Sequence, residues 1–258
     1  MNKKYTYFVF SDAHGEIMPL VSALEDAGWN PNNPNHILIS LGDNFDRGVN
    51  NLEVYNFLLK HDTLTVKGNH DEMLENFLYY KDVQFDIINN GLDRTIIDFA
   101  GLFKNTTRNK VLNQMHHLAF KVNEKYPYLK RFLSEMPHGY KIDDYILTHA
   151  GFTTKYLKHE HDNSWYPNNW TETPEFIKKY DGQTGRFRFI FGHWHAFRLT
   201  ANFIGIVDNF SSIFEYGNFI GIDACTNLTH RVNVYVISSD SEATILTGKE
   251  NLEEIKKM

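Results

Sequence analysis

Residues 42–48, Gly-Asp-Asn-Phe-Asp-Arg-Gly, place two carboxylates and a guanidinium within one short stretch. They directly follow the apolar run 37–41, which is typical of a buried parallel strand. Open α/β sheets bind their ligands at the carboxyl ends of such strands. Taken alone, the stretch is equally compatible with an ordinary polar loop, so its interpretation depends on whether similar loops recur.

Similar loops recur after other apolar runs. The strand-like run 5–11 leads into Asp12 and His14, and the run 63–66 leads into Asn69 and His70. Apolar residues at helical spacing follow both of these loops and residues 42–48 as well. Successive strand–loop–helix units therefore place candidate ligands at the same end of their strands.

Two later predicted strands end in histidine loops. Residues 140–147 lead into His149, and residues 187–191 lead into His193 and His195. The five loops together offer oxygen and nitrogen donors and no thiolate: Asp12, His14, Asp43, Asn69, His70, His149, His193 and His195. Such a set suits borderline metals, namely Mn, Fe, Zn, Co or Ni.

Asp43 is placed to bridge two divalent ions, which lie about 3.5–4 Å apart in two-metal hydrolases. A single zinc ion lowers the pKa of bound water from about 15.7 to about 7. A hydroxide shared by two ions is therefore a ready nucleophile for phosphorus. Two divalent cations also outweigh the nearby carboxylates, so the centre attracts a phosphate although the chain has a net charge of -6.

The rest of the sequence indicates one α/β domain over residues 1–258. Residues 82–138 carry no comparable motif and are predicted to form a mainly helical insertion, placed as a wall or lid over the site. Residues 219–223, 231–237 and 243–246 are predicted strands, antiparallel and in a second sheet.

Bulk composition narrows the class of protein. A hydrophobic fraction of 42% with 15% aromatics is globular, and the single cysteine, Cys225, fits a reducing compartment. No apolar run approaches the roughly 18 residues of a membrane span, and none near residue 1 suits a signal peptide, so we expect a cytoplasmic protein with no membrane partner. The net charge of -6 and the lack of a basic stripe argue against a nucleic-acid partner.

The order of these motifs resembles the calcineurin-like metallophosphoesterases. The motifs are Asp-x-His at 12–14, Gly-Asp-x-x-Asp-Arg-Gly at 42–48, Gly-Asn-His-Asp at 68–71, His-Ala-Gly at 149–151 and Gly-His at 192–193. More narrowly, they resemble the phosphoprotein phosphatase branch in its compact bacterial and phage form, and the diadenosine tetraphosphatases. The resemblance implies a four-layer α/β/β/α sandwich with the metal centre at the strand ends.

The resemblance also implies a role for each motif residue. Asp12 and His14 would bind a first ion, and Asp43 would bridge both ions. The second ion would be bound by three residues: Asn69, His149 and His193. His70 would serve as general acid, held by Asp46, although Asp46 could instead pair with Arg47.

Arg47 would bind phosphate oxygens with its planar guanidinium, and Asn69 would lie beside the substrate. His195 is a candidate ligand of the first ion only by analogy with the wider superfamily, whose Gly-His-x-His loop supplies both ions. The sequence departs from the branch in the loop 164–172, which contains no second phosphate-binding arginine. Arg186 and Arg188 are the candidate replacements, and ordinary strand-edge positions are the alternative for both.

The predicted function is hydrolysis of a phosphate ester in one step, with two divalent ions, Mn before Fe, Zn, Ni or Co, and a metal-bridging hydroxide. A Ser/Thr phosphoprotein or another small phosphorylated molecule is the expected substrate. The first alternative is a dinucleoside polyphosphate or other nucleotide, and a remote one is a non-catalytic scaffold on the same fold. Low Arg and high Asn and Lys content suggest a bacterial or phage-infected host.

Overall fold

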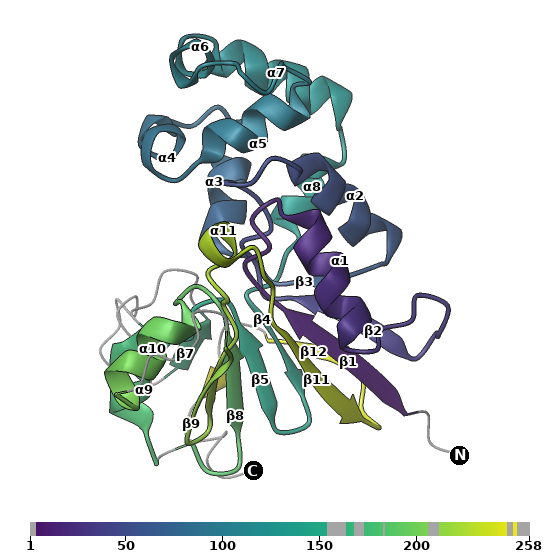
Figure 1. Ribbon diagram of the computed structural model, residues 1–258, viewed down its shortest axis with the longest axis vertical. Coiled ribbons are helices and arrows are strands. Elements are labelled where there is room, and N and C mark those ends of the chain that lie inside the picture. The colour runs from purple at the N-terminus through teal and green to yellow at the C-terminus, as the bar shows by residue number, and fades with distance from the viewer. Residues whose placement is uncertain are drawn as a thin grey trace.

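In the computed structural model, the described residues are 4–153, 164–167, 173–182, 184–205, 212–246 and 250–251. Two mixed sheets pack against each other in the lower half of the molecule (Figure 1). The first has the order β11-β1-β2-β3, in which β1 and β2 are parallel and β11 is antiparallel to β1. Its strands are β1 (Tyr5–Phe10), β2 (His36–Ser40), β3 (Leu64–Thr65) and β11 (Val234–Ser239).

The second sheet has the order β12-β4-β5-β8-β10-β9, with parallel pairing of β5, β8 and β10. Its strands are β4 (Gly139–Ile142), β5 (Tyr145–Thr148), β8 (Arg188–Phe191), β9 (Phe214–Tyr216), β10 (Phe219–Gly221) and β12 (Thr244–Ile245). A small third sheet pairs β13 (Glu250–Asn251), β7 (Ser164–Pro167) and β6 (Phe152–Thr153).

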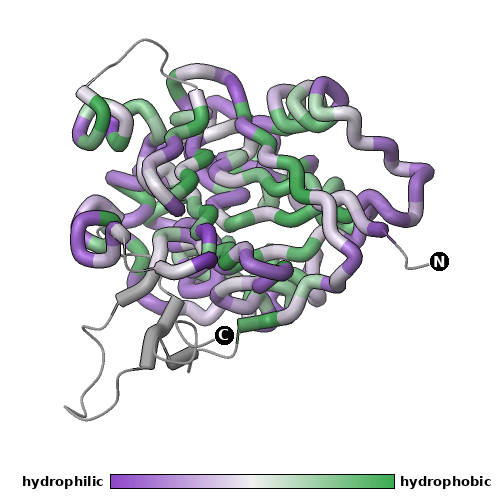
Figure 2. The backbone as a smooth tube through the Cα atoms, turned by 90° about the horizontal axis from the view of Figure 1, so that it is seen from below, coloured by the Kyte–Doolittle hydropathy of each residue, from purple (hydrophilic) through white to green (hydrophobic). Residues whose placement is uncertain are grey.

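A layer of buried, mainly aliphatic side chains lies between the two main sheets. Val9 and Ile39 contribute from the first sheet, and Leu147 and Ile190 from the second, all fully buried. Successive side chains of a strand point to opposite faces of its sheet, so the neighbours of these residues point toward the helices outside. Figure 2 shows hydrophobic segments running through the centre of the molecule.

Helices cover the outer face of each sheet. On the first sheet, Leu20 of α1 and Val54 of α2 pack against Phe8 and Phe10. On the second, α9 and α10 form a cluster with the phenylalanines of β8. The helices outside the insertion are α1 (Ile17–Asp26), α2 (Asn51–Lys60), α3 (Asn69–Leu78), α9 (Thr173–Tyr180), α10 (Ala196–Phe203) and α11 (Thr226–Thr229). This layering confirms the predicted α/β/β/α sandwich.

Residues 82–138 are mainly helical and lie with α3 in the upper half of the molecule (Figure 1). They pack around their own core, in which Leu92, Ile96 and Phe99 meet Phe77 of α3. Their helices are α4 (Gln84–Asn89), α5 (Leu92–Phe99), α6 (Arg108–Asn113), α7 (Met115–Lys125) and α8 (Leu129–Ser134). Every helix in the described ranges is too short or too polar to cross a bilayer.

One predicted strand placement was wrong. The strand predicted over 231–237 is β11, which completes the first sheet beside β1 and does not join the second. The strand predicted over 219–223 is β10, which joins the second sheet and is antiparallel to β9 as predicted, although it is parallel to its other neighbour, β8. The alternation of side chains predicts that a segment is a strand. It does not predict which strand pairs with it, because the same pattern fits either sheet.

Candidate active site

The site lies where five strands end. Asp12 and His14 follow β1, and Asp43, Asp46 and Arg47 follow β2. After β3, Asn69 and His70 form the first turn of α3, His149 follows β5, and His193 and His195 follow β8. His193 and His195 are half-buried and Arg47 is exposed, whereas the other residues of this set are at most 4% exposed. The polar loops of the two main sheets thus lie together at the carboxyl ends of these strands.

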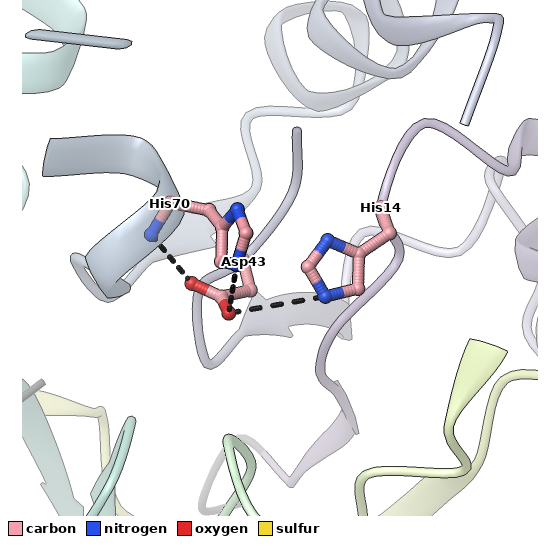
Figure 3. A group of neighbouring side chains, drawn as sticks. All are labelled: His14, Asp43 and His70. Carbon is pink, nitrogen blue, oxygen red and sulfur yellow. Dashed lines mark hydrogen bonds and ion pairs between the residues drawn. The ribbon is translucent and has the colours of Figure 1, made fainter. Parts of the chain in front are cut away.

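The first group of donors is His14, Asp43 and His70 (Figure 3). The Nε2 atoms of both imidazoles lie 3.9 Å from Asp43 Oδ2. Asp12 Oδ1 lies 4.0 Å from His14 Nε2. The first sheet therefore contributes two carboxylates and two imidazoles that face one another.

The second group is Asp43, His149 and His193. His149 Nε2 lies 3.3 Å from Asp43 Oδ1 and 3.0 Å from Asn69 Oδ1. His193 Nδ1 lies 2.9 Å from the same Asn69 oxygen. Asp43 belongs to both groups, with Oδ2 facing the first and Oδ1 facing the second.

The ring orientations suit metal binding. His14 Nδ1 bonds the carbonyl of Phe45 at 2.8 Å, and His149 Nδ1 bonds the carbonyl of Leu41 at 2.7 Å. A carbonyl only accepts, so Nδ1 carries the proton and Nε2 is the nitrogen turned toward the carboxylates. Outer hydrogen bonds of this kind orient metal-ligating histidines in general.

Backbone strain is concentrated in the same loops. Positive φ angles occur at Asp12 (53°), His14 (45°), Asp43 (53°), Asp46 (72°) and His193 (61°). Non-glycine residues avoid this region, and such strain clusters at functional sites. Oxygen and imidazole donors gathered around the buried carboxylates of Asp12 and Asp43 fit a pair of divalent cations.

The loops meet so closely that glycine is required at Gly68 and Gly192. A Cβ on Gly68 would stand 2.3 Å from the backbone nitrogen and Oδ1 of Asp43, and one on Gly192 would stand 2.2 Å from Asp12 Oδ2. Asp71 adds the next support, because its Oδ2 accepts from the backbone N–H groups of Asp43 and Gly68, both at 2.9 Å. Burial and the charge of Asp43 raise the pKa of Asp71 to about 6, which leaves it ionised at neutral pH.

The histidine pKa values depend on which charges face each ring. Burial, reinforced by Arg47, holds the pKa of His14 well below its usual value. Burial, reinforced by His149, lowers the pKa of His193 to about 3. Burial also acts on His149, but the facing charge of Asp43 outweighs it and raises the pKa to about 9. His14 and His193 are therefore neutral, whereas His149 in the metal-free chain is protonated on both ring nitrogens and positively charged.

His70 is held by Asp46. Its Nδ1 lies 2.7 Å from Asp46 Oδ2, and Arg47 Nη2 lies 3.0 Å from its Nε2. Arg47 Nη1 lies 2.9 Å from His14 Nε2, so the guanidinium spans the two rings. A guanidinium only donates, so both rings accept at Nε2. Burial lowers the pKa of His70, but Asp43 and Asp46 outweigh it and the net shift is upward.

The structure leaves three sequence-predicted residues outside this group. Arg186, two residues before β8, pairs through Nε with Asp144 Oδ1 at 2.8 Å. Arg188, the first residue of β8, bonds Tyr145 Oη at 3.2 Å, at the opposite end of the strand from His193. Their role as replacements for the missing arginine stays a prediction, which these contacts do not favour. His195 belongs to neither donor group, and its Nε2 lies 3.8 Å from Asp223 Oδ2.

Sequence reasoning missed two buried residues near these loops. Asp223, after β10, is 2% exposed, and its Oδ1 accepts the Cys225 N–H at 2.7 Å. Thr95, on α5, contacts Asp46 with its hydroxyl. A lone aspartate after a short strand and a lone threonine in an amphipathic helix carry no local signal, so only the tertiary structure identifies them.

The sequence matches the family model for calcineurin-like phosphoesterases over residues 5–197. The chain therefore belongs to the calcineurin-like phosphoesterase family. Membership implies binding of two divalent metal ions, and the two donor groups that share Asp43 are the candidate ligands. The structure is also similar to a crystal structure provisionally assigned as a diadenosine tetraphosphatase, with a TM-score of 0.52, 15% identity and coverage of 91% of this chain and 92% of that one.

Two bacterial relatives share local sequence similarity. The serine/threonine-protein phosphatase 2 of Salmonella typhimurium is 34% identical over 84 residues, which is 33% of this chain and 38% of the relative. The enzyme of the same name from Escherichia coli K12 is 42% identical over 71 residues, 27% of this chain and 32% of the relative. The matched part thus spans about a third of each relative's length.

Proposed function

We propose that this chain is a metal-dependent phosphomonoesterase of the Ser/Thr phosphoprotein phosphatase type. The observation that carries the proposal is the Asp43 carboxylate, which faces two groups of buried donors at once, beside the Asp46–His70 pair. Family membership supports hydrolysis of a phosphate ester, and the names of the two bacterial relatives favour a phosphoprotein substrate.

The proposed ligands draw on the two donor groups, with Asp12 in place of His70 in the first and Asn69 added to the second. Asp12, His14 and Asp43 would hold one ion, and Asp43, with Asn69, His149 and His193, the other. Divalent ions bound there make water acidic and polarise the phosphoryl oxygens. Oxygen and imidazole ligands without a thiolate favour manganese, and they also suit iron, zinc, cobalt or nickel.

His70 would donate a proton to the leaving oxygen. It reaches this role with Nδ1 bound to Asp46, which leaves Nε2 turned toward Asp43 and the donor groups. Arg47 now bonds the Nε2 atoms of His14 and His70 with its two terminal nitrogens. The same two donors match two oxygens of a phosphate, so we propose that the guanidinium exchanges these ring nitrogens for substrate oxygens.

The helical segment 82–138 would form one wall of the substrate site. Its support is that Gly91 and Thr95 contact the loop carrying Asp46 and Arg47. A second arginine on the opposite wall is not part of the proposal, because Arg186 and Arg188 are engaged elsewhere. Arg47 is then the main side chain for phosphate oxygens.

Hydrolysis of three substrates tests the proposal: p-nitrophenyl phosphate, a phosphoserine peptide and diadenosine tetraphosphate, each with Mn²⁺ and with a chelator. We expect Mn²⁺-dependent turnover of the first two and preference for the peptide. Preference for diadenosine tetraphosphate would replace the substrate class by nucleotides. Absence of turnover with all three would contradict the enzymatic proposal and favour a scaffold.

A further inference from the structure

Helix α5 and the residue before it contact the chain after β2 at three points, two in the loop and one at the start of α2. The backbone N–H of Arg47 donates to the Gly91 carbonyl at 3.4 Å, just before α5 begins. The N–H of Leu52, in the first turn of α2, donates at 2.8 Å to Oδ2 of Asp98, the next-to-last residue of α5. Between these contacts, Thr95 meets Asp46. A segment without any recognisable motif thus supports the loop that carries two proposed catalytic side chains.

The Thr95 hydroxyl makes two hydrogen bonds to the same residue. It accepts from the backbone N–H of Asp46 at 2.9 Å and donates to Asp46 Oδ1 at 2.5 Å. The other carboxylate oxygen, Oδ2, accepts from His70 Nδ1 at 2.7 Å. Thr95 and Asp46 are both fully buried. The Asp46 carboxylate therefore has one oxygen fixed by Thr95 and one left for His70.

We propose that Thr95 is a positioning residue, which fixes the Asp46 carboxylate so that His70 is held with Nε2 toward the reacting groups. The inference rests on the proposed function, in which His70 acts on the leaving oxygen. Asp46 has a φ of 72°, a strained backbone that persists only when its surroundings hold it. Thr95 holds both the backbone and the side chain of that residue.

The docking of α5 leaves little freedom for another arrangement. A Cβ on Gly91 would stand 2.9 Å from the backbone nitrogen of Arg47, so the helix start and the loop are in direct contact. Thr95 follows Gly91 by one turn and faces the same loop. Threonine is also stiffer at χ1 than serine, because it is branched at Cβ. The hydroxyl is thus presented by a rigid element.

The first test compares Thr95→Val, which keeps the shape and removes the hydroxyl, with Thr95→Ser, which keeps the hydroxyl. Steady-state kinetics of the Mn²⁺-loaded enzymes are measured with phenyl phosphate, a poor leaving group, and p-nitrophenyl phosphate, a good one. We expect Thr95→Val to lower kcat for phenyl phosphate about 10-fold more than for p-nitrophenyl phosphate, because only the poor leaving group needs the acid strongly. KM should stay within about 3-fold, and Thr95→Ser should recover most of kcat.

Thr63→Val is the matched control. Thr63 is also buried, and its hydroxyl has no hydrogen-bond partner among the described residues. This variant should leave kcat unchanged for both substrates. Equal losses of kcat with the two substrates, or a serine variant as impaired as the valine variant, would overturn the proposal.

A double-mutant cycle separates positioning from general stabilisation. If Thr95 acts through Asp46 on His70, Thr95→Val should reduce kcat no further in a His70→Ala background, since residues that act as a unit are not additive. An additive loss would mean that Thr95 acts independently of His70. Where Thr95→Val does not fold, as judged by circular dichroism, Thr95→Ala takes its place in the same cycle.

A readout without turnover distinguishes failure of this inference from failure of the proposed function. In the metal-free chain, the Nδ1 proton of His70 should give a downfield NMR resonance, because it is hydrogen-bonded to a buried carboxylate. Removing the Thr95 hydroxyl should shift or broaden this resonance, and Thr95→Ser should restore it. An unchanged resonance in Thr95→Val would contradict the positioning role whether or not the wild-type chain hydrolyses any phosphate ester.

Discussion

Two roles compete for His70, because its Nε2 lies 3.9 Å from Asp43 Oδ2 and a carboxylate partner such as Asp46 also supports metal-ligating histidines. As a general acid, His70 is separable from metal binding. His70→Ala should then keep two metal ions per chain and lower kcat by about 10²–10⁴-fold. Metal content by elemental analysis, measured beside kcat, decides between the roles.

His117→Ala is the control for that substitution, since His117 is exposed on α7. It should change neither metal content nor kcat. Loss of one ion per chain in His70→Ala would show that His70 is a ligand and would remove the general acid from the account.

As a proposed ligand of the second ion, His149 should set the pH dependence of binding at that position. Its pKa in the metal-free chain is about 9, and a metal ligand must be deprotonated, so the ion bound by His149 should displace one proton below that pH. Mn²⁺ affinity should rise about 10-fold per pH unit and level off near the pKa of His149. Calorimetry in two buffers of different ionisation enthalpy measures the released proton.

The raised pKa of His149 also makes the stability of the metal-free protein depend on pH. The raised pKa stabilises the metal-free protein fully below the ordinary histidine pKa of about 6.5, and this contribution is lost as the pH rises through about 9. Mn²⁺ binding without proton release at pH 7 would contradict the assignment of His149 as a ligand.

At the scale of elements, the loops depend on glycine at their closest approach. Gly68 has an ordinary φ of -88°, so any penalty at this position is steric and comes from Asp43 at 2.3 Å. Gly68→Ala should displace Asp43 and weaken Mn²⁺ binding by at least about 10-fold, the size of effect that supporting residues have on metal affinity. Isothermal titration of the folded variant measures it.

Gly182→Ala provides the contrast. Gly182 has a φ of 68°, and nothing lies within 4 Å of the added Cβ. This substitution should cost about 1 kcal/mol of stability through backbone strain and leave metal affinity unchanged. Equal Mn²⁺ affinities in the two variants would contradict the packing of Gly68 against Asp43.

Much of the site could be predicted because strand–loop–helix units have a local sequence pattern, an apolar run followed by a polar loop and then apolar residues at helical spacing. The apolar run before Asp43 and the helical spacing after it fix both the loop and its end of the sheet, as they do for Asp12 and Asn69. Thr95 and Asp223 could not be predicted, because their importance arises from partners distant in sequence. Strand β11 was placed in the wrong sheet for the same reason, since pairing is a tertiary property.

At the scale of the whole molecule, the layer between the sheets fixes the distance between the two sets of loops. Ile190 of β8 is fully buried there, two residues before the close approach at Gly192. Ile190→Ala should cost about 2–5 kcal/mol of unfolding free energy, as buried large-to-small changes do. Urea denaturation of the metal-free protein measures this cost.

Ile245→Ala is the corresponding surface change, because Ile245 is 60% exposed on β12. Its cost should stay within about 0.5 kcal/mol. Comparable costs in the two variants would contradict the placement of Ile190 in a packed layer between the sheets.

In the proposed function, one carboxylate, that of Asp43, joins loops from both sheets into a single two-metal centre. The most direct test is the number of Mn²⁺ ions bound per chain after equilibrium dialysis, in the wild type and in Asp43→Ala, with the exposed Asp240→Ala as control. We expect two ions in the wild type and in the control, and loss of binding at both positions in Asp43→Ala. A wild-type chain that binds a single ion, or an Asp43→Ala chain that keeps one ion at wild-type affinity, would contradict it.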